Sequence, residues 1–233
     1  MGHKFCGNCG ALLSSSSATK RTEATLGLRA VADDGAEGEF FHLGEDEVTI
    51  GRGAGTVSLA DPSVSPIHAF VTWRDDGLLL RDAGSTNGTY LRVRDATMLN
   101  SGDVFHIGEQ FLRFESNLDF TDERPAGGAA FGGTPPRAWH FRLVQLLPGE
   151  REGLVHCSLR STVTIGREGC DLEFPYDVYL TAEHCRVERY DHCFRLVDSQ
   201  SRNGTFIRLT RPVSLAEGDL ILVGRQLLRV ASL

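Results

Sequence analysis

The sequence lacks the features of a membrane or exported protein. No apolar run approaches the roughly 18 residues that a membrane-spanning helix needs. The first residues, Met1-Gly2-His3-Lys4-Phe5-Cys6, contain no apolar segment of the kind found in secretory signals. The composition, 41% hydrophobic and 24% charged residues, is typical of a globular protein. We therefore expect a cytoplasmic protein with no membrane insertion.

The chain also lacks an excess of positive charge. It has 24 Lys and Arg against 31 Asp and Glu, which gives a net charge of −7 at pH 7. This balance disfavours binding of a nucleic-acid backbone over the protein surface. Nucleic acid is therefore not an expected partner.

Helical periodicity is missing as well. No ten-residue segment repeats its apolar residues every 3.6 positions. Stretches such as Val48-Thr49-Ile50 and Ala69-Phe70-Val71-Thr72-Trp73 have strand chemistry instead, with turn residues at intervals of about 8 to 12 positions. The sequence predicts an all-β fold made of antiparallel β-sandwiches.

Cysteine is sparse and does not suggest a disulfide framework. Four of the six cysteines, Cys157, Cys170, Cys185 and Cys193, lie in the last third of the chain without a close CxxC pair. We interpret these four as small apolar fillers.

What the chain does contain is an internal repeat. Ser85-Thr86-Asn87-Gly88-Thr89 recurs 116 positions later as Ser201-Arg202-Asn203-Gly204-Thr205. His68 and His184 keep the same offset, and Gly51-Arg52 recurs 115 positions later as Gly166-Arg167. Each copy is long enough to enclose a core of its own, so we expect two modules that fold independently.

The repeat divides the chain into five parts. Residues 26–116 and 139–233 are the two predicted β-sandwich modules, here called repeat one and repeat two. Residues 117–138 are rich in Gly and Pro, which predicts a flexible linker that lets the modules reorient. Residues 14–25 have no apolar period and are expected to form a flexible tether, and residues 1–13 carry a separate cysteine motif.

The N-terminal motif is Cys6-Gly7-Asn8-Cys9-Gly10, in which two thiolates could share one Zn²⁺ ion. It resembles the first half of a short zinc ribbon, but no second CxxC follows. Three interpretations remain open: a degenerate remnant, a zinc site completed by His3 or by a second chain, and a redox pair. The shared-zinc interpretation would make the protein a dimer.

Three motifs occur in the same order in both repeats: Gly51-Arg52, Ser65-Pro66-Ile67-His68 and Asn87-Gly88 in repeat one, with counterparts in repeat two. On an all-β module these motifs resemble those of the forkhead-associated (FHA) family, which reads phosphorylated motifs. The resemblance covers both repeats and hence most of the chain.

The resemblance implies a phosphothreonine site in each repeat. In repeat one, Arg52 would clamp the phosphate, Ser65 and Thr86 would add polar contacts, and Asn87 would hold the peptide backbone. Three further residues, Gly51, His68 and Gly88, would have structural roles, with His68 bracing the loops. Ser65 and His68 are not interpreted as a catalytic pair, because no third member and no nucleophile elbow accompany them.

Repeat two departs from this pattern. Arg167 and Asn203 match the binding residues, and Gly166, His184 and Gly204 match the structural ones. Thr181 replaces the usual serine, and Arg202 stands where repeat one has Thr86. The second site is therefore expected to read a different ligand.

These observations predict a non-enzymatic adaptor that binds phosphothreonine-containing proteins, such as the substrates of a Ser/Thr kinase or the kinase itself. An alternative is a scaffold that binds proteins independently of phosphate, especially through repeat two. No cofactor is expected apart from zinc at Cys6 and Cys9.

Overall fold

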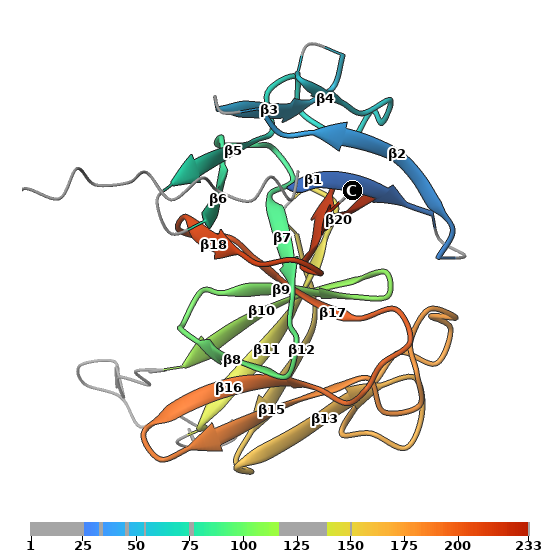
Figure 1. Cartoon of the computed structure of the whole chain (residues 1–233). Coiled ribbons are helices and arrows are strands. Elements are labelled where there is room, and N and C mark those ends of the chain that lie inside the picture. Colours follow the sequence, from blue (N-terminus) through green and yellow to red (C-terminus); the bar gives the residue numbers. More distant parts are fainter. Residues whose placement is uncertain are drawn as a thin grey trace, which may run out of the picture.

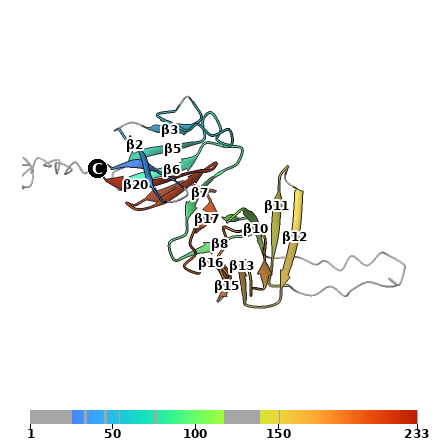
Figure 2. The same cartoon turned by 90° about the vertical axis from the view of Figure 1, so that its right-hand side faces the viewer.

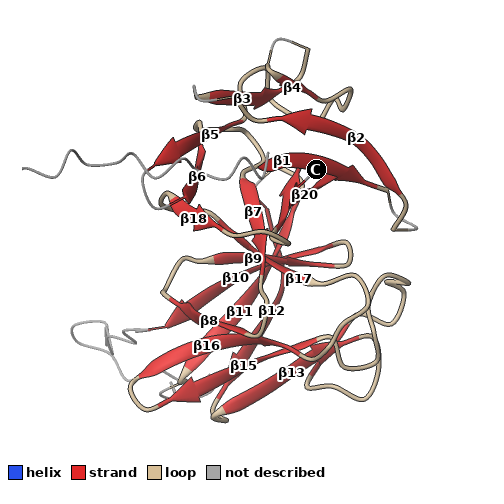
Figure 3. Cartoon of the chain, in the orientation of Figure 1, coloured by secondary structure: helices blue, strands red, loops and turns tan. Residues whose placement is uncertain are grey.

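The computed structural model describes residues 26–32, 35–44, 47–53, 55–74, 77–116, 139–149 and 151–232. Every regular element in these residues is a β-strand (Figure 3). The part of the chain that is described has no helix long and apolar enough to cross a membrane. The predicted all-β fold is confirmed. Cys6 and Cys9 lie outside the described residues, and the zinc interpretation stays a prediction.

Each repeat contributes ten strands. Repeat one forms β1 (Leu26–Val31), β2 (Glu37–His42), β3 (Val48–Gly51), β4 (Val57–Ser58), β5 (Ala69–Arg74), β6 (Gly77–Asp82), β7 (Thr89–Arg92), β8 (Ala96–Leu99), β9 (Val104–Ile107) and β10 (Gln110–Ser116). Repeat two forms β11 (Phe141–Leu147), β12 (Arg151–Ser158), β13 (Thr162–Gly166), β14 (Leu172–Glu173), β15 (Cys185–Tyr190), β16 (Cys193–Asp198), β17 (Thr205–Arg208), β18 (Val213–Leu215), β19 (Leu220–Val223) and β20 (Gln226–Ser232).

The local sequence accounts for these strands. In β5 the inward side chains of Ala69 and Val71 are buried, while Phe70 and Thr72 between them are partly exposed. This alternation is that of a strand with one face on a core. Gly108 and Gly224, with φ of 53° and 61°, adopt the left-handed conformation in the tight turns that join β9 to β10 and β19 to β20.

Three sheets make two sandwiches. The largest has ten strands in the order β12-β11-β10-β9-β17-β7-β19-β20-β1-β2 and runs through both sandwiches. One five-stranded sheet, β18-β6-β5-β3-β4, shares a core with the half that contains β1 and β20; we call this unit sandwich A. The other, β14-β13-β15-β16-β8, shares a core with the half that contains β10 and β11 and forms sandwich B. Figure 2 shows the two as separate lobes joined through the β7 and β17 region.

The two repeats exchange their last three strands. Sandwich A combines β1 to β7 of repeat one with β18, β19 and β20 of repeat two. Sandwich B combines β11 to β17 of repeat two with β8, β9 and β10 of repeat one. In Figure 1 the red β20 therefore lies beside the blue β1, and the green β8, β9 and β10 belong to the yellow and orange lobe.

Both cores consequently contain residues from both repeats. The core of sandwich A includes Ile50 and Leu80 from repeat one together with Ile221 and Leu228 from repeat two, all fully buried. Between the sandwiches lies a smaller shared cluster of Tyr90, Val104, Phe206 and Leu220. Burial of apolar area is the main stabilising term in folding, so neither repeat retains its full stabilisation without the other.

Polar contacts across the exchange are reciprocal. The backbone N–H of Arg225 donates to the Asp61 carboxylate at 2.7 Å, and that of Glu109 donates to the Asp177 carboxylate at 2.8 Å. In each pair the carboxylate and the amide come from different repeats. The pKa of Asp61 lies below its ordinary value, because hydrogen bonds from Ser63 and Arg225 outweigh the burial that would raise it.

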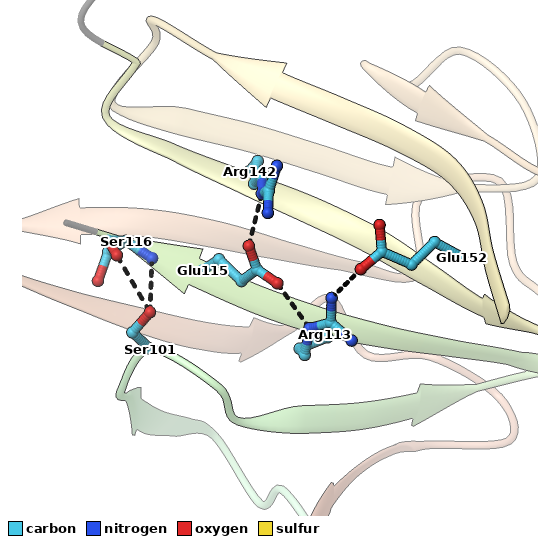
Figure 4. A network of polar contacts seen from close by, with 6 residues as sticks. All are labelled: Ser101, Arg113, Glu115, Ser116, Arg142 and Glu152. Atoms are coloured by element: carbon cyan, nitrogen blue, oxygen red, sulfur yellow. Dashed lines mark hydrogen bonds and ion pairs between the residues drawn. The ribbon is translucent and has the colours of Figure 1, made fainter. Parts of the chain in front are cut away.

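A charged network joins β10 of repeat one to β11 and β12 of repeat two (Figure 4). The Glu115 carboxylate accepts hydrogen bonds from Arg113 at 2.6 Å and from Arg142 of repeat two at 2.5 Å. Arg113 also pairs with Glu152 of repeat two. These partly exposed pairs add modestly to stability and fix the register of the exchanged strand.

The exchange corrects the expectation that each repeat folds independently and reorients about the linker. The limits 26–116 and 139–233 stand as limits of the sequence repeats, whereas each sandwich draws strands from both. The sequence could not distinguish these arrangements, because the two sets of last strands share the same alternation and the same turn glycines. Judged by alternation and turn glycines alone, either set of strands could complete either sandwich.

Candidate functional site

The first motif of repeat one ends β3 and starts an exposed loop. Gly51 is fully enclosed: a Cβ atom at this position would lie 2.0 Å from the carbonyl oxygen of Pro66. The close approach lets the backbone N–H of Arg52 donate to the Ser65 carbonyl at 3.0 Å. The Arg52 side chain is exposed. A glycine is required here so that the arginine and the serine loop lie side by side.

His68 joins the serine loop to the Asn87 turn. Its side chain is fully buried, and its Nδ1 accepts a hydrogen bond from the backbone N–H of Ser65 at 3.0 Å. The Nε2 atom lies 3.0 Å from the carbonyl oxygen of Gly88. Because Nδ1 accepts, Nε2 carries the proton and donates to Gly88, which defines a neutral tautomer.

The turn of residues 85–89 is organised by Asp82. Its carboxylate accepts hydrogen bonds from the Ser85 hydroxyl and the Thr89 hydroxyl, each at 2.7 Å. The Ser85 hydroxyl in turn accepts from the N–H of Gly88, which has φ of 83°. Burial raises the pKa of Asp82, but these hydrogen bonds outweigh it and hold the pKa below its ordinary value. Asp82 is therefore ionised at neutral pH, the form that accepts these hydrogen bonds.

The two loops converge through Ser65 and Asn87. The Ser65 hydroxyl oxygen accepts a hydrogen bond from the N–H of Thr86 at 3.2 Å, so its own proton remains available to an outside acceptor. The Asn87 amide nitrogen donates to the carbonyl of Ser63 at 2.7 Å. We call the group Arg52, Ser65, Thr86 and Asn87 site one.

The geometry also disfavours a catalytic role for Ser65 and His68. His68 contacts the backbone N–H of Ser65, and the serine hydroxyl is directed to Thr86. A general base must reach the proton of its nucleophile. The pair in this structure organises a loop.

Repeat two reproduces the frame of site one. The N–H of Arg167 donates to the Thr181 carbonyl at 2.9 Å, and His184 joins the Thr181 N–H to the Gly204 carbonyl. Burial lowers the pKa of His184. The hydrogen bond to the Gly204 carbonyl raises this pKa, and the positive charge of Arg92 lowers it further. The Asn203 amide donates to the carbonyl of Tyr179 at 2.7 Å.

The predicted binding residues of repeat two are arranged differently. The Thr181 hydroxyl donates to the carbonyl of Glu183 at 2.8 Å, within its own loop. Arg167 forms an ion pair with Glu168 at 3.6 Å. Arg202 and Asn203 are exposed. We call the group Arg167, Thr181, Arg202 and Asn203 site two.

An apolar surface adjoins site two. The side chains of Tyr176 and Val178 are 96% and 76% exposed, and Tyr179, whose carbonyl receives the Asn203 amide, is 49% exposed. The corresponding loop of repeat one carries Ser63 in place of Tyr179. The two sites therefore offer different surroundings to a ligand.

Sequence reasoning missed several residues of the sites. Asp82 and Asp198 organise the turns, and Ser63 and Tyr179 receive the asparagine amides. The aspartates could have been found, because they also lie 116 positions apart. The carbonyl acceptors could not, because a backbone oxygen has no sequence signal.

No group of three or more His, Cys, Asp or Glu side chains able to hold a metal ion occurs within the described ranges. A cavity of about 320 Å³ lies next to the Ser63 loop and is lined by Ala60, Asp61, Pro62, Ser63, Arg225 and Gln226. Both repeats therefore contribute to the surface beside site one.

Comparison with known proteins identifies relatives of part of the chain. E3 ubiquitin-protein ligase CHFR of Homo sapiens is 36% identical in an alignment of 107 residues, and the match covers 42% of this chain and 15% of the ligase. The chain thus spans a small part of that protein. A solved structure from "Structural and functional analysis of phosphothreonine-dependent FHA domain interactions" has 30% identity and covers 36% of this chain and 91% of its own, with a TM-score of 0.24.

The FHA domain family matches the chain twice, over residues 48–108 and 163–224, which together make up more than half of it. Each match contains one full set of the motifs described above. The tandem organisation expected from the repeat is confirmed: the chain belongs to the FHA domain family and carries two FHA domains in sequence.

Proposed function

We propose that this chain is an adaptor that binds phosphothreonine-containing proteins through site one. The observation that carries the proposal is the convergence of the loops that hold four polar residues: backbone hydrogen bonds join Arg52 to Ser65 and Thr86 to the Ser65 hydroxyl, and the Asn87 amide bonds the neighbouring Ser63 carbonyl. No ion pair of Arg52 is found among the described residues. A phosphate with nearly two negative charges and three acceptor oxygens matches such a set.

Rigidity supports the same proposal. His68 and Asp82 hold the two loops through buried or partly buried hydrogen bonds, so little conformational freedom is lost when a ligand binds. The extended peptide on either side of the phosphothreonine would meet Asn87, whose amide oxygen can accept a backbone N–H.

The proposal also includes the partners of the chain, its location and its mode of action. The partners would be substrates of a Ser/Thr kinase, or the kinase itself, in the cytoplasm. The chain would act by binding and would not catalyse a reaction, in agreement with FHA domains being binding modules.

The test is titration of matched phosphothreonine, phosphoserine and unmodified peptides against the full chain and its Arg52→Ala variant. Charged hydrogen bonds contribute about 1.5 to 3 kcal/mol each, so Arg52→Ala should weaken phosphothreonine binding by about tenfold or more. Arg74→Ala, which removes a cation of the same sandwich outside site one, is the control. Equal affinity for phosphorylated and unmodified peptides would refute the proposal.

Site two favours a second function, recognition of a protein surface without phosphate. The Thr181 hydroxyl is committed to Glu183, Arg167 is paired with Glu168, and Tyr176 and Val178 offer apolar area. Exposed apolar patches often mark protein interaction sites. A partner held through site two should then tolerate Arg167→Ala and be lost on Tyr176→Ser. Loss of binding on Arg167→Ala alone would instead place phosphate at site two.

A further inference from the structure

The exchange of strands places an arginine from one repeat against the recognition turn of the other. Arg208 of β17 lies against Gly88, the residue after Asn87 of site one: a Cβ atom on Gly88 would be 2.4 Å from Nε and 3.0 Å from Cζ of Arg208. Arg92 of β7 lies in the same way against Gly204 in site two, at 2.6 and 3.0 Å. The contact is therefore present twice, with the repeats interchanged.

The backbone fixes these arginines. β7 and β17 pair antiparallel, with Arg208 opposite Tyr90 and Arg92 opposite Phe206. The Leu209 N–H donates to the Thr89 carbonyl at 2.8 Å, one residue beyond Gly88. Arg92 and Arg208 are both half-buried. The ladder that joins the two sandwiches therefore places each arginine beside the glycine of the other repeat.

Glycine is what permits the contact. Gly88 and Gly204 have φ of 83° and 88°, where side chains are disfavoured, and the missing Cβ leaves the peptide face open. A planar guanidinium and its methylene stem can cover such a face. The covered turn contains the asparagine that faces the ligand, so its conformation is restricted before a ligand arrives.

We propose that Arg208 and Arg92 are positioning residues for the opposite repeat: Arg208 fixes the Asn87 turn of site one, and Arg92 fixes the Asn203 turn of site two. Each site is thus completed only by the other repeat. The inference rests on the proposed function to the extent that site one binds a phosphopeptide. It goes further because it makes Arg208 of repeat two necessary for the full peptide affinity of site one in repeat one.

The test measures phosphothreonine-peptide affinity at site one in a chain that carries Arg167→Ala and Tyr176→Ser, so that neither mode of binding considered for site two contributes. Adding Arg208→Ala should weaken binding about three- to tenfold, the effect of a turn that must be ordered on binding. Arg92→Ala in the same background is the matched control and should leave site-one affinity unchanged. No effect of Arg208→Ala, or an effect of Arg92→Ala alone, would overturn the assignment.

A conservative variant separates positioning from simple charge. Arg208→Lys keeps the positive charge and loses the planar group, so its affinity should stay below that of the parent chain. Full affinity in Arg208→Lys would show that charge alone matters and would contradict a positioning role. Unfolding midpoints of all variants are measured so that the titrations compare folded proteins.

The exchange itself is tested without any peptide. A protease site inserted into residues 117–138 of the full chain allows the repeats to be separated after folding. Exchanged repeats should elute together on gel filtration after cleavage, because each core contains strands of both. Separation into two folded halves would refute the exchange and the arginine assignment.

The two failures are distinguishable. If the uncleaved, unsubstituted chain prefers no phosphorylated peptide, the proposed function fails and the positioning role fails with it, whatever the elution shows. If it prefers phosphothreonine but Arg208→Ala has no effect, only the positioning role fails.

Discussion

At the scale of single residues, one hydroxyl group is used differently in the two sites. Ser65 accepts from the Thr86 N–H and keeps its proton free, whereas Thr181 donates its proton to Glu183. A phosphate oxygen needs a donor, so under the proposed function Ser65 would serve a phosphopeptide and Thr181, in this conformation, would not.

Ser65→Ala is therefore expected to weaken phosphothreonine binding at site one by about tenfold, because it removes a charge-assisted hydrogen bond and leaves the Thr86 N–H without its acceptor. Thr181→Ala is the matched change in repeat two and should have little effect on any phosphate-dependent binding. Isothermal titration with phosphorylated and unmodified peptides measures both. Equal losses in the two variants would contradict the distinction between the sites.

A second residue-scale feature is His106, which lies in the contact between the sandwiches. Its ring is 4.5 Å from that of Phe111 and 6.3 Å from that of Phe206 of repeat two. Its Nδ1 is buried without a hydrogen-bond partner among the described residues. Burial lowers the pKa of His106 to about 4. The neutral imidazole is therefore the form that fits the folded protein.

Because the pKa of His106 is about 4 in the folded chain and 6.5 in its unperturbed form, the unfolded chain takes up the proton first as the pH falls. The contribution of neutral His106 to the free energy of unfolding is complete above about pH 6.5. It falls by roughly 2 to 3 kcal/mol as the pH decreases toward 4. His106→Leu should remove this part of the pH dependence, since Leu222 occupies the equivalent position of repeat two. Urea unfolding between pH 4 and 7 tests this, with Leu222→His as the opposite control.

At the scale of elements, β8 and β18 have exchanged places. β18 of repeat two pairs with β6 in sandwich A, and β8 of repeat one pairs with β16 in sandwich B. Leu215 and Leu99 bring a buried side chain from these strands to the core of the other repeat's sandwich. Truncation of either leucine should therefore destabilise strands that lie far away in the sequence.

Leu215→Ala is expected to destabilise sandwich A by about 2 to 3 kcal/mol, the usual cost of a cavity in a core. Hydrogen exchange should accelerate first in β5 and β6 of repeat one, more than 130 positions away in sequence. Leu99→Ala should do the same to β15 and β16 of repeat two. Faster exchange confined to the strands of the mutated repeat would contradict the exchanged topology.

At the scale of the whole molecule, one sheet of ten strands passes through both sandwiches. The cluster of Tyr90, Val104, Phe206 and Leu220 lies between them and is buried by both. Loss of one sandwich removes strands from the other. The relative placement of sites one and two is consequently fixed by the sheet, and the linker is not needed to hold the repeats together.

The chain should unfold in a single cooperative transition. Calorimetric and van't Hoff enthalpies should agree for the whole chain, because the two cores share strands. Two resolved transitions in differential scanning calorimetry, each shifted by mutations of one repeat only, would contradict this prediction. The Ser65→Ala chain, altered on the surface of sandwich A, is a suitable control that should keep a single transition.

Local sequence determined the strands, the turns and the motif residues of this protein. Alternating apolar residues, turn glycines and the offset between the copies predicted an all-β fold built from two repeats, and the motif residues carried the resemblance to FHA domains. Only the tertiary structure decided which copy of β8 to β10 completes which sandwich. The two copies present the same alternation to either core, so the choice depends on the contacts that form between distant segments, among them Arg208 against Gly88 and Arg92 against Gly204.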